Sequence, residues 1–75
     1  MSNTYQKLEI PKLIELKNDL SFIIATHIDI ESVNLGILLF KGTLYNYETD
    51  GSVELVGEYF INYHIKEDSY YDLND

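Results

Sequence analysis

Apolar and polar side chains alternate most clearly between Ser21 and Glu31. In an extended chain one face would carry Phe22, Ile24, Thr26, Ile28 and Ile30, and the other Ala25, His27, Asp29 and Glu31. Alternation with a period of two residues is typical of a strand that is buried on one side. Residues 21–31 are therefore predicted to form a strand that buries the face of Phe22 and becomes increasingly polar on the other face.

Three further segments have the pattern of strands. Residues 34–42 form a dense apolar run with a glycine near each end, which is typical of a central strand. Residues 44–56 contain the two-residue turn signal Asp50-Gly51 between two β-prone arms, which predicts a hairpin. Residues 58–66 alternate again, and predict a last strand that continues the second arm of this hairpin.

The segment before these strands has a different period. Its apolar residues Leu13, Ile14, Leu16 and Leu20 lie at helix-like spacings, and Pro11 is tolerated at a first helical position. Two features oppose a helix, since no good cap precedes Pro11 and the like charges Glu15 and Asp19 are four residues apart. The pattern still favours a helix over residues 11–20. The expected fold class is α+β, a short N-terminal helix packed on a three- to four-stranded antiparallel β-meander.

The chain is short enough to limit its organisation. With 75 residues it is expected to form one domain with a small core. Residues 1–66 are assigned to this single small α+β domain, and residues 67–75 to an acidic, tyrosine-containing C-terminal tail. The sequence has no cysteine, which excludes disulfides and thiolate metal sites. Neither a secretory signal nor a membrane span is expected from its N-terminus and its short apolar runs.

Charge is the strongest compositional signal. The sequence has 13 acidic residues, 5 lysines and no arginine, for a net charge of −8, and residues 1–20 are neutral overall. Binding to nucleic acid or to an anionic membrane is disfavoured, because both require clustered cations. Two interpretations remain open. The charge attracts a basic partner, or it serves only solubility.

Few residues suit catalysis or metal binding. The only histidines, His27 and His64, lie in predicted strands, and no nucleophile, base or phosphate-binding glycine loop accompanies them. His27 and Asp29 share a strand face that His64 could join to bind a metal, but an acidic strand with one histidine commonly gives this pattern. We therefore expect no enzyme, no cofactor and no metal.

A protein-binding surface is the remaining expectation. Tyr70 and Tyr71 lie outside the predicted strands, among carboxylates, whereas Tyr45, Tyr47, Tyr59 and Tyr63 are explained by cross-strand packing. Carboxylates beside aromatic rings suit a partner rich in Arg and Lys. The candidate partner-binding residues are Asp29, Glu31, Glu48, Asp50, Glu54, Glu58, Glu67, Asp68, Tyr70, Tyr71, Asp72 and Asp75. If strands 21–31 and 58–66 were neighbours, several of these acids would share a face.

Small, cysteine-free, acidic and tyrosine-rich chains resemble, in kind, the phage-encoded inhibitors that include anti-CRISPR proteins and other anti-defence DNA mimics. This resemblance implies a non-enzymatic inhibitor that binds a basic nucleic-acid-handling protein in the cytoplasm of an infected or host bacterial cell. It would act by steric and electrostatic competition. The alternatives are a self-associating structural or assembly module, in which a homo-oligomer forms through a sheet edge, and an immunity protein for a basic nuclease toxin.

Overall fold

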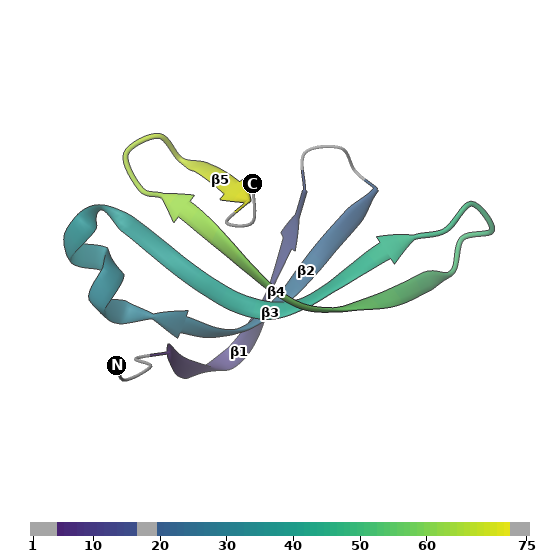
Figure 1. Cartoon of the computed structure of the whole chain (residues 1–75), viewed down its shortest axis with the longest axis horizontal. Helices are drawn as coiled ribbons and strands as arrows, with labels where there is room; N and C mark the ends of the chain where they lie inside the picture. Colours follow the sequence, from purple (N-terminus) through teal and green to yellow (C-terminus); the bar gives the residue numbers. More distant parts are fainter. Residues whose placement is uncertain (1–4, 17–19, 73–75) are drawn as a thin grey trace.

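The protein is an all-β, five-stranded antiparallel sheet. The computed structural model describes residues 5–16 and 20–72. Its elements are β1 (Tyr5–Glu15), β2 (Ser21–Asp29), the 3₁₀ helix η1 (Ile30–Leu35), β3 (Ile37–Tyr47), β4 (Val53–His64) and β5 (Ser69–Asp72). The strands lie in the order in which they occur in the chain, so each pairs with its sequence neighbour (Figure 1). β1 and β5 are the two edges of this meander.

The predicted N-terminal helix is wrong, and with it the α+β fold class. Residues 11–15 belong to β1. Ile14 is buried opposite Ile23 of β2, and the residue before it, Leu13, is exposed. The apolar spacing of this segment fits a strand as well as a helix. Residues 17–19 of the predicted helix lie outside the described residues, and η1 is the only helix in the part of the chain that is described.

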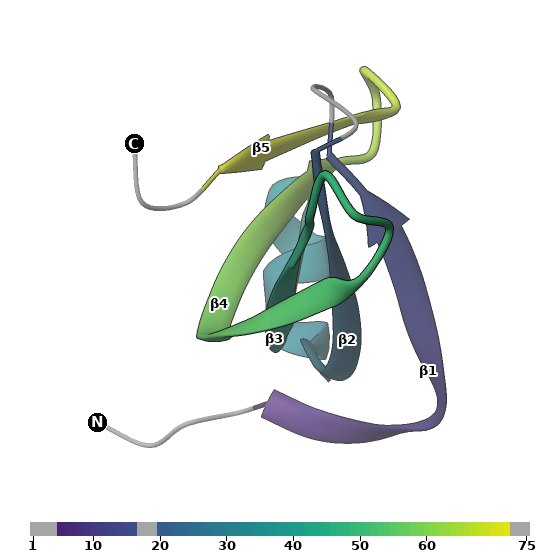
Figure 2. The same cartoon turned by 90° about the vertical axis from the view of Figure 1, so that its right-hand side faces the viewer.

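β1 is strongly irregular in its middle. Lys7 pairs with His27 and Lys12 with Ala25, so four residues of β1 lie opposite a single residue of β2. Pro11 is within this irregular stretch, where the absence of an amide hydrogen costs no ladder hydrogen bond. β1 bends here and curves away from the plane of its neighbours (Figure 2). The proline that we placed at a helix start thus belongs to an edge strand.

Before the bulge at Thr26, β2 buries the opposite face from the one expected. Ile23 and Ala25 are fully buried, whereas Phe22 is only half-buried. A bulge at Thr26 interrupts the pairing with β3, and beyond it Ile28 packs against the same core as Ile23. Because a bulge inserts one extra residue, it changes which alternate positions face inward. A single period of two therefore does not describe the whole strand.

The core occupies one face of the sheet, which we call the core face. Its buried apolar residues are Ile14, Ile23, Ala25, Phe40 and Ile61, contributed by β1 to β4. Partly buried side chains, among them Leu38, Tyr63 and Tyr70, surround this cluster. The opposite face, which we call the outer face, carries Phe22, Lys41 and Tyr45.

The connections between the strands differ in detail from the prediction. The strand expected over 34–42 begins only at Ile37, because η1 continues to Leu35. Gly36 caps the C-terminus of η1 in a left-handed conformation with φ of 77°. The hairpin around Asp50-Gly51 is confirmed, but residues 48–52 form its turn, which is longer than two residues. Gly51 has φ of 90°, a conformation that glycine adopts without strain.

The segment expected to be a tail contains a strand. β5 pairs with the end of β4, with Tyr70 opposite Tyr63 and Tyr71 opposite Asn62. Tyr70 packs against the core, so the expectation that Tyr70 and Tyr71 lie outside strands is wrong. Asp75 lies outside the described residues.

Candidate protein-binding surface

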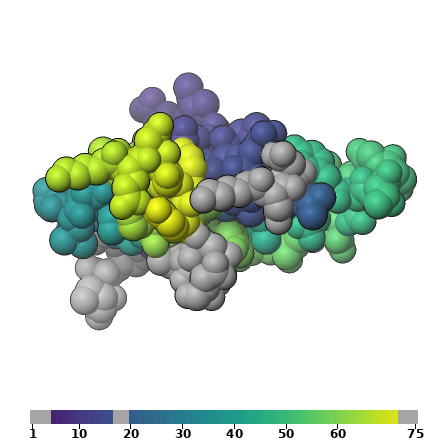
Figure 3. Space-filling model, turned by 90° about the horizontal axis from the view of Figure 1, so that it is seen from above, coloured from purple at the N-terminus to yellow at the C-terminus, as the bar shows by residue number. Residues whose placement is uncertain are grey.

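Most of the predicted acidic residues fall into two groups at opposite ends of the sheet, whereas Glu58 lies within β4 and Asp72 within β5. The molecule measures 42 × 25 × 23 Å along its principal axes. One end is the tip of the β3–β4 hairpin with Glu48, Asp50 and Glu54, and the other is formed by η1 and the β4–β5 turn (Figures 1 and 3). The second end carries Asp29, Glu31, Glu67 and Asp68. β3 lies between β2 and β4, so the strands we expected as possible neighbours are not adjacent.

The hairpin turn holds its carboxylates close together. A hydrogen bond between the side chains of Glu48 and Glu54, and the charge of Glu54, raise the pKa of Glu48. Asp50 instead accepts hydrogen bonds from the backbone N–H and the hydroxyl of Ser52, at 2.9 and 2.6 Å, and these bonds lower its pKa. Asp50 therefore stays ionised in mild acid, while Glu48 retains a proton more readily.

Tyrosines bind the two carboxylates of the β4–β5 turn. The Tyr71 hydroxyl donates to Glu67 at 2.7 Å, and the Tyr63 hydroxyl donates to Asp68. Each bond raises the pKa of the tyrosine, because the carboxylate holds the phenolic proton. The backbone of this end is fixed as well, since the Ile65 N–H donates to the Gly36 carbonyl at 3.0 Å. Glu67 and Asp68 are thus presented from an ordered turn.

Asp29 and Glu31 lie where β2 passes into η1. The Asp29 carboxylate accepts a hydrogen bond from the Glu31 N–H at 3.0 Å and so caps η1. The Asp29 carbonyl accepts from the Ser32 hydroxyl at 2.7 Å, and that hydroxyl in turn accepts from the Leu39 N–H. A structural role in the turn therefore accounts for Asp29, whereas Glu31 projects into solvent.

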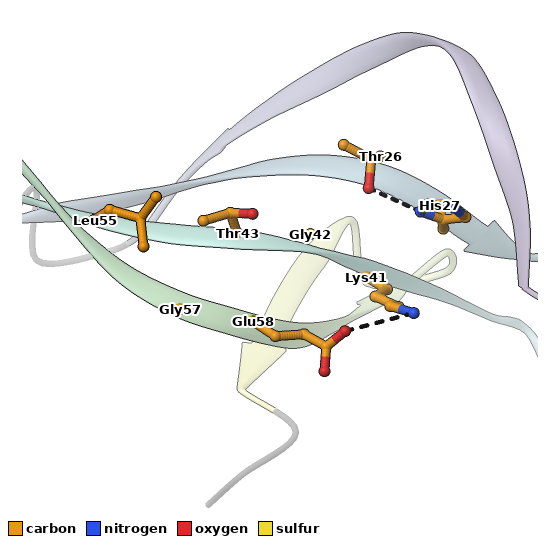
Figure 4. Close-up of a pocket in the computed structure, with 8 residues that line it drawn as sticks. All are labelled: Thr26, His27, Lys41, Gly42, Thr43, Leu55, Gly57 and Glu58. Carbon is orange, nitrogen blue, oxygen red and sulfur yellow. Dashed lines mark hydrogen bonds and ion pairs between the residues drawn. The ribbon is translucent and has the colours of Figure 1, made fainter.

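Among the predicted acids, Glu58 lies beside a lysine of the neighbouring strand. Its carboxylate lies 3.5 Å from the Lys41 ammonium group (Figure 4). This pair borders an open hollow of about 380 Å³ at the middle of the sheet. The Lys41 ammonium also lies 5.9 Å from the centre of the Tyr5 ring, whose pKa is raised by burial and by the charge of Asp29. The Lys41 ammonium group therefore offsets part of the negative charge of Glu58.

The same hollow contains one contact that sequence reasoning missed. Thr26, at the β2 bulge, has its hydroxyl 2.8 Å from Nδ1 of His27 (Figure 4). This contact fixes the imidazole of His27 at the rim of the hollow. No sequence signal marks it, because it depends on where the bulge falls.

The two histidines do not form a common site. His27 pairs with Lys41 and His64 with Ile37, four positions apart along β3. Within the described residues no three metal-binding side chains gather closely enough to hold an ion. His64 instead packs its ring on Tyr71, with ring centres 4.3 Å apart.

A second feature that sequence reasoning missed is an aromatic surface at the hairpin end of the outer face. We call it the hairpin-end patch, and it consists of Phe22, Tyr45, Tyr47, Val53 and Leu55. The Phe22 ring lies 5.2 Å from the Tyr45 ring and 5.1 Å from the Tyr47 ring. Tyr45 and Tyr47 pair with Leu55 and Val53 across the hairpin, as cross-strand packing predicts, yet the patch stays open to solvent.

Comparison with known proteins identifies no relative. No protein-family model, no curated protein and no solved structure matches the chain. In the part of the chain that the structure describes, no helix has the length and apolar character that crossing a membrane requires. Function must therefore be argued from the geometry of these surfaces.

Proposed function

We propose that this protein is a non-enzymatic acidic inhibitor that binds a basic, nucleic-acid-handling protein in the cytoplasm of a bacterial cell. The observation that carries this proposal is the placement of carboxylates on exposed turns at both ends of an elongated sheet. The hairpin turn carries Glu48 and Asp50, with Glu54 at the start of β4, and the β4–β5 turn carries Glu67 and Asp68. A basic surface that spans the molecule would meet negative charge at each end.

The charge of the protein is poorly compensated along most of its length. Lys41 and Lys66 are the only cations after residue 20, and Lys41 is already beside Glu58. The uncompensated negative charge creates an electrostatic field that accelerates the approach of a basic partner. This effect weakens as the salt concentration rises, because salt screens the charges. Once bound, the sheet would exclude nucleic acid from the same basic surface by its bulk and its charge.

The proposal does not require the acids to copy the spacing of DNA phosphates. Duplex DNA presents charge continuously along its axis. The acids of the two end groups are instead separated by the aromatic hairpin-end patch and by the Lys41–Glu58 pair. Competition by charge and bulk is therefore the mechanism that we propose.

The direct test is capture of partners from bacterial lysate on the immobilised protein, with elution by a salt gradient. We expect a basic nucleic-acid-binding protein whose affinity falls as salt rises, and whose binding to nucleic acid is lost when this protein is added. Neutralising the hairpin turn with E48Q, D50N and E54Q should slow association. An affinity that is the same at low and high salt would contradict the proposal.

Self-association is a second candidate, because several apolar side chains of the outer face are exposed, among them Leu55. It predicts a molecular mass that rises with protein concentration and is insensitive to substitution of the acids. An immunity protein for a basic nuclease toxin would use the same charges. Only the identity of the captured partner, a toxin or a host protein, separates that role from the leading proposal.

A further inference from the structure

Several apolar and aromatic side chains of the hairpin-end patch remain exposed to solvent in the folded sheet. The exposed fractions are 63% for Leu55, 47% for Val53 and 42% for Tyr47. These side chains lie on neighbouring positions of β3 and β4, so they form one continuous surface. Contiguous exposed apolar surface commonly marks a site of interaction with another protein.

The patch is also rigid, because its side chains are held on paired strands. Phe22 of β2 lies against both Tyr45 and Tyr47 of β3, and the Tyr47 backbone N–H donates to the Leu20 carbonyl at 2.8 Å. Aromatic rings that are fixed before binding lose little conformational entropy when a partner covers them. The surface therefore needs no rearrangement to accept a ligand.

The charges around the patch indicate what kind of ligand fits. Glu15 pairs with Phe22 across β1 and β2, and the hairpin turn adds Glu48 and Asp50. The sequence has no lysine or arginine between Lys41 and Lys66, and Lys41, the one lysine of the hairpin, is already beside Glu58. A guanidinium group suits this setting, because it stacks on aromatic faces and binds carboxylates at the same time.

The same charges argue against a second copy of this chain as the ligand. Two patches placed face to face would bring the carboxylates of both hairpin turns together. None of the five patch residues is a cation, and Lys41 is already beside Glu58. Like charges brought together across an interface oppose association. A basic ligand avoids this repulsion.

We propose that the hairpin-end patch is the contact surface for an apolar, arginine-containing segment of the partner protein. The inference rests on the proposed function and adds which part of the molecule makes contact. Leu55, Val53 and the Tyr47 ring would bury the aliphatic side chains of the segment. Its guanidinium groups would stack on the aromatic rings and pair with the carboxylates at the edge.

The test uses a synthetic peptide in which leucine and arginine alternate, added to the isotope-labelled protein and followed by NMR. We expect chemical-shift changes concentrated on β3 and β4 around Tyr45, Tyr47 and Leu55. The control is the same peptide with citrulline in place of arginine, which keeps the shape and removes the charge. The citrulline peptide should bind at least about tenfold more weakly, since the charged group contributes at a central contact.

Two matched substitutions locate the contact. Leu55→Ser in the patch should weaken peptide binding by about tenfold, as removal of a central apolar contact does. Leu35→Ser at the opposite end, where the side chain is 77% exposed, should change it by less than about twofold. Both positions are exposed, so folding should survive each change, and a circular dichroism spectrum of each variant checks this.

Three results would overturn the inference. They are shift changes confined to the acidic turns, equal binding of the citrulline peptide, and equal effects of Leu55→Ser and Leu35→Ser. The first result would leave the proposed function standing, because the protein would still bind a basic ligand. Failure to bind any basic peptide or protein would remove both. A mass that rises with concentration, and that Leu55→Ser prevents, would assign the patch to a second copy instead.

Discussion

At Gly42 the sheet leaves no room for a side chain. A Cβ atom there would lie 2.1 Å from the Ile24 carbonyl oxygen and 2.6 Å from the Ala25 Cα, both of them backbone atoms. Gly42→Ala must therefore push β2 and β3 apart. We expect it to lower the free energy of unfolding by about 1–3 kcal/mol or more, as overpacking does.

Chemical denaturation followed by circular dichroism measures this loss. Gly36→Ala is the matched control, because nothing lies within 4 Å of a Cβ there and only the left-handed backbone is strained. That strain costs about 1 kcal/mol. A Gly42→Ala protein as stable as the Gly36→Ala protein would contradict the proposed close approach of the strands.

The hairpin turn contains two carboxyl groups with opposite dependence on pH. The pKa of Glu48 is raised in the folded protein by Glu54, so its contribution to stability is present in acid and is lost as pH rises through the folded pKa. Glu48→Gln removes the repulsion that develops. We expect this variant to melt at a higher temperature than the parent at pH 7, with the difference disappearing toward about pH 4.

Asp50 should show the reverse behaviour. The pKa of Asp50 is lowered by the two hydrogen bonds from Ser52. Its contribution to the stability of the folded protein is therefore present at neutral pH and is lost as pH falls through the folded pKa. Asp50→Ala should lower the melting temperature at pH 7 and have less effect at about pH 3. Melting curves at a series of pH values test both variants. Parallel shifts at every pH would show that neither charge is responsible.

Among the elements, β5 gives the clearest test of the fold. Tyr70 packs against the core and lies 4.8 Å, ring centre to ring centre, from Tyr63, whereas the neighbouring Tyr71 is 42% exposed. Tyr70→Ala should therefore lower the free energy of unfolding by about 2–3 kcal/mol, somewhat less than a fully buried aromatic residue would. Tyr71→Ala should cost clearly less. Similar losses from both would indicate that β5 does not pack as described.

The strands were easier to predict than the way in which they pack. The hairpin around Asp50-Gly51 could be predicted because its turn chemistry is local. The segment around Ile14 was misassigned because its apolar spacing fits a helix as well as an edge strand. The bulge at Thr26 changes which alternate positions of β2 face the core, from Ile23 and Ala25 before it to Ile28 after it, and a bulge has no reliable signal in composition.

At the scale of the whole molecule, the candidate surface was only partly predictable. The exposure of acids such as Glu48 and Glu67 follows from their place in turns. Their separation into two ends does not, because it depends on the strand order, which places β3 between β2 and β4. The hairpin-end patch was missed because cross-strand packing already accounted for Tyr45 and Tyr47, and sequence gives no measure of how much of each ring stays exposed.

The irregular middle of β1 also bears on how the protein behaves at high concentration. A straight, apolar edge strand recruits strands from other molecules and promotes aggregation. Ile10 is 81% exposed on this edge, but Pro11 and the lost register beside it interrupt the row of free donors and acceptors. Pro11, which we placed at the start of a helix, thus makes β1 a poorer template for edge-to-edge pairing between molecules.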